Sequence, residues 1–279
     1  MRKNSFILNN TELFYEEMGQ GTPFLLIHGW AIDHRFLMNA LEPAFNKCDR
    51  PDMFRRIYVD IPGMGQSIPG DVKNGDDIIE VLFAFMEEIA PGEKFYVGGN
   101  SFGASLSRAM VAKWPEKILG AMFIVPSSKY GSNIPAIDGI YRKDEKFLKS
   151  LPIPDRAAFC IMNANLTEEC YKRYKTDALP SVRDNRNNDY LKKTLKGSFS
   201  FDVEKKLEKI KYEGPVLILT ARHDATVGYE KQFEWINIFP HASYMMIDGA
   251  GHNANIDQPE MFTYIVVGWL DCILNDYML

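Results

Sequence analysis

The chain has 279 residues, of which 46% are hydrophobic and 25% are charged, and its formal net charge is −5. This length and composition are those of a globular protein with one large domain or two small ones, and they argue against disorder. The net negative charge argues against a nucleic-acid-binding protein, which needs a basic surface. Cys48, Cys160, Cys170 and Cys272 form no CxxC motif, so we expect reduced thiols without a zinc or redox role.

Neither a signal peptide nor a membrane-spanning helix is predicted. The basic start of the chain, Met1-Arg2-Lys3, is followed by only a short apolar run, Phe6–Leu8, before Asn9. The longest apolar stretch, Tyr264–Leu270, is far shorter than the roughly 20 residues that cross a bilayer. We therefore expect a cytoplasmic protein whose partner is a small-molecule substrate rather than a nucleic acid. Homo-oligomer formation stays open.

Apolar runs and helical patterns alternate along most of the chain. A hairpin is predicted first, with strands at Ser5–Leu8 and Glu12–Tyr15. Helices are predicted over Asp76–Ile89, Ala104–Trp114 and Pro259–Asn275. The alternation predicts an α/β fold, with a mostly parallel central sheet flanked by helices. The continuous apolar runs, which suit strands buried on both faces of such a sheet, are Pro23–Ile27, Arg56–Asp60, Lys94–Val97, Ala121–Val125, Val216–Thr220 and Ser243–Ile247.

One long segment interrupts this alternation. Over residues 127–211 the pattern predicts several amphipathic helices, for example Glu168–Lys175 and Asn188–Leu195, and no buried strand. We therefore expect this segment to be a helical cap, inserted between two strands of a core domain. Residues 1–126 and 212–279 would form that core domain.

The sharpest chemical signal is Gly99-Asn100-Ser101-Phe102-Gly103, a G-x-S-x-G motif between a predicted strand and a predicted helix. In this setting a tight turn lifts the serine hydroxyl out of the sheet. Side chains at positions 99 and 103 would collide with the neighbouring strand and helix. The motif alone also fits a glycine-rich turn with an incidental serine, but the strand and helix around it favour a nucleophile. Ser101 is therefore the predicted nucleophile.

A serine hydroxyl needs a general base, and the chain has five histidines. His252 ends the flexible loop Asp248-Gly249-Ala250-Gly251-His252 directly after the last predicted strand, so we predict that it is the base. Its carboxylate partner is predicted to be Asp224, which follows another strand at the same sheet edge. Asp248 is too close along the chain to face the ring, and Asp257 is assigned to the start of the next helix.

The order Ser101, Asp224, His252 is the order of the α/β-hydrolase fold, and the chain resembles this superfamily over nearly its whole length. Two further segments are similar to loop motifs of the superfamily. They are His28-Gly29-Trp30, after the first buried strand, and Asp60-Ile61-Pro62-Gly63-Met64-Gly65-Gln66-Ser67, after the next one.

The resemblance implies an oxyanion hole formed by the backbone N–H groups of Trp30 and Phe102, together with a structural role for His28. It also implies a cap that covers the nucleophile and shapes the pocket. No cofactor is expected, and no metal is predicted because no pair of histidines has ligand spacing with a carboxylate. Six aromatic side chains either line the pocket or pack in the core: Trp30, Phe102, Phe147, Phe159, Tyr171 and Tyr174.

The favoured hypothesis is a serine hydrolase that cleaves small carboxylic esters or related acyl compounds through an acyl-enzyme. Asn100, before the serine, is shared with hydrolases that cleave carbon–carbon bonds, so a C–C bond or lactone hydrolase is an alternative. Ala31-Ile32-Asp33 and Asn253 depart from the pattern of those enzymes. A third hypothesis is a non-catalytic ligand-binding member, because a fold does not fix a function. A serine nucleophile argues against dehalogenase or epoxide hydrolase chemistry.

Overall fold

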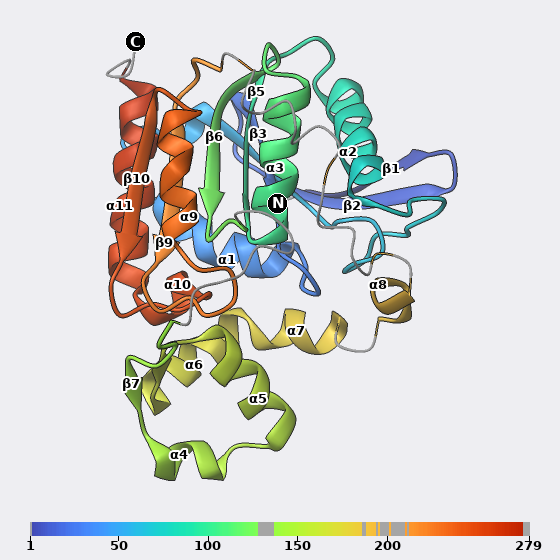
Figure 1. Ribbon diagram of the computed structural model, residues 1–279. Coiled ribbons are helices and arrows are strands. Elements are labelled where there is room, and N and C mark those ends of the chain that lie inside the picture. Colours follow the sequence, from blue (N-terminus) through green and yellow to red (C-terminus); the bar gives the residue numbers. More distant parts are fainter. Residues whose placement is uncertain are drawn as a thin grey trace.

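The computed structural model describes residues 2–127, 137–185, 188–193, 195, 201, 210 and 212–275. Within these ranges the core is an eight-stranded sheet. Its strands are β1 (Arg2–Leu8), β2 (Thr11–Met18), β3 (Thr22–Ile27), β4 (Phe54–Val59), β5 (Phe95–Asn100), β6 (Ile118–Ile124), β9 (Val216–Ala221) and β10 (Ala242–Ile247). They lie in the order β1-β2-β4-β3-β5-β6-β9-β10 (Figure 1). β2 is antiparallel to both of its neighbours and the other pairs are parallel, which confirms the predicted mostly parallel sheet.

Helices cover both faces of this sheet, as expected for an α/β fold (Figure 1). α2 and α3 pack on one face, whereas α1 and α11 pack on the other. None of the helices that the described residues form is long and apolar enough to cross a membrane. The helices of the core are α1 (His34–Phe45), α2 (Gly75–Ile89), α3 (Phe102–Lys113), α9 (Glu230–Phe233), α10 (Ala254–Asp257) and α11 (Pro259–Leu274), with 3-10 helices at Pro51–Met53 and Glu234–Asn237.

The apolar core is divided by the sheet into two halves. Along β3, Leu25 and Ile27 pack in the half beneath α2 and α3, whereas Phe24 and Leu26 pack in the half beneath α1 and α11. Successive side chains of a strand point to opposite faces, so a strand covered on both faces is apolar at every position. This burial explains why β3 is a continuous apolar run in the sequence.

Two helices differ from the sequence-based expectation. α2 begins at Gly75, one residue before the predicted start at Asp76, and its cap is Asn74, whose side chain accepts the N–H of Asp77. α1 was not predicted, and Pro43 lies within it. Proline is disfavoured in the interior of a helix, so Pro43 argues against a helix in this segment although its apolar residues follow a helical pattern.

Between β6 and β9, the described residues form five short helices and two very short strands, which lie below the sheet in Figure 1. The predicted helices overlap α6 and α8. The expectation of no buried strand is wrong for β8, which is buried and pairs with β7, because a two-residue strand shows no periodicity. Residues 128–136 and most of 194–211 of the predicted cap lie outside the described residues. The elements are β7 (Arg142–Lys143), α4 (Glu145–Ser150), α5 (Ile153–Met162), β8 (Asn165–Leu166), α6 (Glu168–Asp177), α7 (Leu179–Asn185) and α8 (Asp189–Lys193).

The carboxyl ends of the parallel strands define one edge of the sheet, where ligands of open α/β sheets generally bind. The loops at this edge carry the residues that the sequence singled out. Trp30 follows β3, Ser101 follows β5, Asp224 follows β9 and His252 follows β10. The topology therefore brings to one edge four positions that are far apart in the sequence.

Candidate active site

Ser101 occupies a strained turn between β5 and α3. Its φ of 54° and ψ of −116° lie in a region that residues with a side chain rarely adopt. A Cβ atom at Gly103 would lie 2.0 Å from the carbonyl oxygen of Ile27, and one at Gly99 would lie 2.5 Å from the same oxygen. Glycine at both positions therefore allows β3, β5 and α3 to approach closely enough to form the turn.

His252 and Asp224 form a hydrogen-bonded pair at the same edge. Nδ1 of His252 lies 2.8 Å from Oδ2 of Asp224, whose side chain is fully buried. Oδ1 of Asp224 accepts the backbone N–H groups of Thr226 and Val227 at 2.8 Å and 3.0 Å, so both carboxylate oxygens are engaged. When Nδ1 donates to this carboxylate, Nε2 of the neutral ring is the proton acceptor.

The two other aspartates that the sequence offered as partners of His252 lie elsewhere. Asp248 is exposed, and its Oδ1 lies 3.7 Å from Nε of Arg222 and 3.6 Å from Nε2 of His223. Asp257 is buried and is the last residue of α10, rather than part of the following helix α11. The geometry therefore pairs His252 with Asp224.

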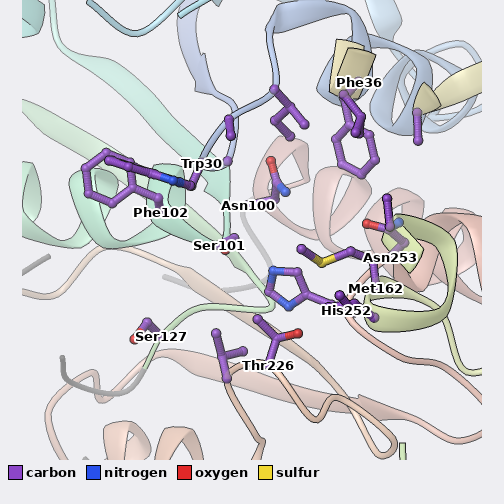
Figure 2. Close-up of a pocket in the computed structure, with 18 of the residues that line it drawn as sticks. Trp30, Phe36, Asn100, Ser101, Phe102, Ser127, Met162, Thr226, His252 and Asn253 are labelled. Carbon is purple, nitrogen blue, oxygen red and sulfur yellow. The ribbon is translucent and has the colours of Figure 1, made fainter. Parts of the chain in front are cut away.

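Ser101 and His252 line one cavity of about 510 Å³. Figure 2 shows the imidazole ring beside Ser101, with Met162 and Asn253 on the far side of the ring. The cavity lies between the edge of the sheet and the helices α5, α6 and α7. No charged side chain is among the described residues that line it, and their polar side-chain groups are hydroxyls, amides, the indole of Trp30 and the imidazole of His252.

The apolar wall contains only some of the aromatic residues considered from the sequence. Trp30, Phe102 and Tyr174 line the cavity, and the rings of Trp30 and Phe102 meet edge to face at 5.4 Å. The other three, Phe147, Phe159 and Tyr171, pack against one another beside α6.

Sequence reasoning missed several cavity residues. Ile32 comes from the loop before α1, Phe36 from the first turn of α1, Val182 from α7, and Thr226 from the loop after β9. An apolar residue on a helix has the same sequence pattern whether it faces a cavity or a filled core. Only the motif residues carried a signal that could have found them.

Phe102 is the first residue of α3, and Trp30, in the loop after β3, lies beside it at the cavity wall (Figure 2). The first N–H groups of a helix have no partner within the helix, and the helix dipole favours negative charge at this end. The N-terminus of α3 therefore creates a favourable environment for an anion next to Ser101.

His28 fixes the loop that carries Trp30. Its fully buried ring accepts the backbone N–H of Ile61 at Nε2, at 3.0 Å, so Nδ1 donates to the carbonyl oxygen of Gly29 at 2.7 Å. Burial lowers the pKa of His28, and the ring is neutral with both nitrogens engaged. This is a structural arrangement, since neither nitrogen is available for proton transfer.

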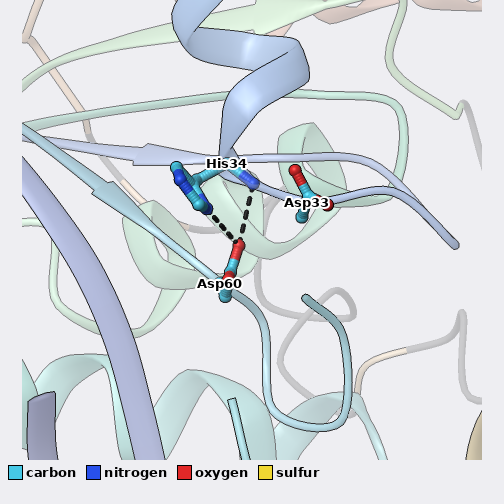
Figure 3. Close-up of side chains that lie close together, drawn as sticks. All are labelled: Asp33, His34 and Asp60. Carbon is cyan, nitrogen blue, oxygen red and sulfur yellow. Dashed lines mark hydrogen bonds and ion pairs between the residues drawn. The ribbon is translucent and has the colours of Figure 1, made fainter. Parts of the chain in front are cut away.

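Asp33, His34 and Asp60 bring together the atom types that bind metals (Figure 3). Oδ1 of Asp60 accepts both the backbone N–H and Nδ1 of His34 at 2.8 Å, while Oδ2 accepts the N–H of Gln66 at 2.8 Å. The two oxygens of Asp33 accept the guanidinium of Arg35 at 2.9 Å and 2.6 Å. Because these oxygens already accept protein donors, the cluster fits a buried hydrogen-bond network better than a set of metal ligands.

The family model of the alpha/beta hydrolase fold matches residues 22–259. The chain belongs to this family. Among solved structures, an alpha/beta superfamily hydrolase from Oenococcus oeni PSU-1 is similar to it with a TM-score of 0.84 and 25% identity, covering 97% of this chain and 99% of the other.

Several hydrolases of named activity are similar at lower identity. A pimeloyl-[acyl-carrier protein] methyl ester esterase of Shewanella woodyi is 23% identical over 279 residues, covering 94% of this chain and 99% of the relative. Lipase 3 of Moraxella sp. is 24% identical over 250 residues, covering 83% and 72%. A 2-hydroxy-6-oxononadienedioate/2-hydroxy-6-oxononatrienedioate hydrolase of Pseudomonas putida is 22% identical over 281 residues, covering 93% and 91%. These similarities and the fold identify the protein as a hydrolase of the alpha/beta family.

Proposed function

We propose that this protein is a serine hydrolase that cleaves carboxylic esters with an uncharged, apolar acyl group. The observation that carries the proposal is the convergence on one cavity of Ser101, in its strained turn, and His252, paired with Asp224 at 2.8 Å. A nucleophile, a base and a carboxylate that orients the base are the groups required for acyl transfer through a covalent intermediate.

The proposed reaction begins with attack of the Ser101 hydroxyl oxygen on the ester carbonyl carbon, while Nε2 of His252 takes the hydroxyl proton. Asp224 stabilises the imidazolium, and the N–H groups of Trp30 and Phe102 stabilise the oxyanion. As the carbon–oxygen bond breaks, His252 gives the proton to the departing alcohol. A water molecule that transfers its proton to His252 then hydrolyses the acyl-enzyme, and the imidazolium returns that proton to Ser101.

The cavity wall supports an uncharged acyl group. Burying an unpaired charge is costly, and the described lining residues include no lysine or arginine that would pair with a carboxylate. The relative from Pseudomonas putida is named for a dienedioate, a substrate with two carboxylates. This contrast favours ester cleavage over the cleavage of such carbon–carbon bonds, although both reactions would use Ser101 and His252.

A fluorophosphonate probe tests the nucleophile directly. We expect it to label the wild-type protein at Ser101, and we expect Ser101→Ala to abolish labelling. Ser105→Ala is the matched control, because Ser105 also lines the cavity but lies one turn further along α3. Labelling should persist in this variant. A folded wild-type protein that is not labelled and has no turnover would instead favour the non-catalytic ligand-binding alternative.

A substrate panel separates the remaining alternatives. We expect kcat/KM to be highest for p-nitrophenyl esters of neutral, apolar acids, and lower for esters of dicarboxylic acids. Lactones and vinylogous diketones belong in the same panel. A higher kcat/KM for either class would transfer the assignment to a lactone hydrolase or a C–C bond hydrolase.

A further inference from the structure

A buried carboxylate joins the loop after β10 to the segment between α5 and α6. This carboxylate belongs to Asp257, which is 3% exposed. Its Oδ2 accepts the backbone N–H of Gly251 at 2.8 Å on one side and that of Ala164 at 2.7 Å on the other. Its Oδ1 accepts the backbone N–H of Asn165 at 3.2 Å and the side-chain amide of Asn163 at 3.1 Å. One side chain therefore binds two segments that are distant in the sequence.

A second set of contacts reinforces this connection on the other side of His252. The backbone N–H of Asn253 donates to the carbonyl oxygen of Met162 at 2.8 Å, and its side-chain amide donates to Oδ1 of Asn163 at 3.0 Å. Both neighbours of His252 in the sequence, Gly251 and Asn253, are thus hydrogen-bonded across this junction. Met162 and His252 both line the cavity, so the junction also sets the distance between the ring and this part of the wall.

The donors around Asp257 explain why a carboxylate occupies a buried position. Hydrogen bonds to an ionised acceptor are stronger than those between neutral groups, and several converge here. The thiol of Cys170, a free and buried cysteine, adds a contact at 3.2 Å. Burial and the negative charge of Asp257 both raise the pKa of this thiol, so it remains protonated and can donate. A neutral amide at position 257 would direct its own N–H groups at some of these donors.

We propose that Asp257 is a positioning residue, which holds His252 at its working distance from Ser101 through Gly251 and fixes the cavity wall at Met162 through Ala164. The inference rests on the proposed function, in which His252 is the base. Catalysis depends steeply on such placement, because a displacement of about 1 Å can cost about 10² in rate. Asp257 acts through the backbone of the loop and need not contact the substrate.

The test compares Asp257→Asn with Asp155→Asn. Asp155 is a matched control, because it is a buried carboxylate of α5, 4% exposed, that pairs with Arg183 of α7 at 2.6 Å. We expect Asp257→Asn to lower kcat for ester hydrolysis and the rate of fluorophosphonate labelling by about 10², with a much smaller change in KM. Asp155→Asn should lower the Tm while kcat stays within a few-fold of wild type.

Hydrogen exchange provides a readout that needs no turnover. In Asp257→Asn the amides of Gly251 and Asn253 and those of Ala164 and Asn165 should all exchange faster, whereas Asp155→Asn should leave the amides of the His252 loop unchanged. Faster exchange confined to one of the two segments would overturn the proposed coupling. If the wild-type protein neither turns over esters nor is labelled, the proposed function fails, and exchange still decides whether Asp257 joins the segments.

A purely structural role would give a different result. If Asp257→Asn lowers the Tm as Asp155→Asn does but leaves kcat unchanged, Asp257 does not position His252 and the proposal is overturned. Should Asp257→Asn fail to fold, Asn163→Ala replaces it, since this change removes one hydrogen bond to Asp257 and one from Asn253. A kcat lowered roughly tenfold, about the value of one hydrogen bond, would support the proposal, and an unchanged kcat would overturn it.

Discussion

The pairs His252–Asp224 and His34–Asp60 share the same local geometry in two different surroundings. In both, Nδ1 of the histidine lies 2.8 Å from a carboxylate oxygen, and both rings are nearly buried, with exposed fractions of 8% and 3%. They differ in what the ring faces. Nε2 of His34 lies 3.4 Å from Oε1 of Glu16, whereas His252 borders the cavity beside Ser101. Access to a cavity, rather than the histidine–aspartate hydrogen bond, therefore distinguishes a candidate base from a structural pair.

The two histidines also differ in their surroundings, because the carboxylates around His34 raise the pKa of its ring. Burial alone would lower the pKa of His34, but the hydrogen bond and charge of Asp60, together with the charges of Asp33 and Glu16, raise it above its ordinary value. The carboxylates from β2 and the loop after β4 thus stabilise the protonated ring of His34 relative to a free histidine. This is the opposite of what a general base needs, since a base must accept a proton from the nucleophile.

The largest expected effect comes from removing each histidine in turn. His252→Ala should lower kcat by about 10⁶, because loss of the base in a serine hydrolase removes nearly all nucleophile activation. Its Tm should change little. His34→Ala should do the opposite and lower the Tm while kcat per folded molecule stays within a few-fold. Steady-state kinetics measure kcat and thermal unfolding measures the Tm of both variants. Full activity in His252→Ala would contradict it.

Replacing Asp224 and Asp60, the carboxylate partners of the two histidines, tests the same contrast. Asp224→Asn should lower kcat/KM by about 10⁴, because an amide in this place disfavours the tautomer in which Nδ1 of His252 donates. Asp60→Asn should instead lower the free energy of unfolding by about 3 kcal/mol, since it removes one partner of a buried charged pair. Denaturant unfolding and esterase kinetics measure both. Equal losses of activity in the two variants would show that the pairs are not functionally distinct.

The pH dependence of stability sharpens the difference further. The folded-state pKa of His34 lies above the ordinary value of 6.5, so its pairing contributes fully below pH 6.5 and is lost as the pH rises through the folded-state pKa. We expect His34→Gln to lower the free energy of unfolding by about 3 kcal/mol at low pH, and by less as the pH rises above that range. Denaturant titrations of both proteins measure this difference, and one that grows with pH would contradict the assignment.

The sequence predicted the sheet and the positions of Ser101, Asp224 and His252 at its edge, because each of these signals is local. A buried parallel strand is a continuous apolar run, and the nucleophile motif combines a strand, two glycines and a helix within a few residues. The roles of these three residues remain predictions. Nothing local marks Asp257, whose contacts come from a segment that is close only in the folded chain. The ion pairs of His34 could not be predicted either, since their carboxylates, Glu16 and Asp60, belong to β2 and to the loop after β4.

The same reasoning explains why the cavity wall was harder to predict than the motif residues. Ala157 and Ala158 are neighbours on α5, yet Ala157 is exposed and Ala158 lines the cavity. Their side chains are identical, and only the packing of α5 against the rest of the chain separates them. This neighbouring pair therefore provides a test of whether the cavity beside His252 determines substrate choice.

The smallest expected effect comes from filling this cavity without touching either histidine pair. Ala158→Leu should lower kcat/KM about tenfold for long-chain esters relative to short-chain esters, because each methylene that the pocket cannot take costs about 1–3 kcal/mol. Ala157→Leu, which adds the same atoms on the solvent side, should leave the ratio unchanged. The Tm of both variants should stay near that of wild type, since neither alters His34 or Asp60. The same chain-length profile in both variants would mean that the acyl group does not lie in this cavity. The cavity would then no longer explain the difference between the His252–Asp224 and His34–Asp60 pairs.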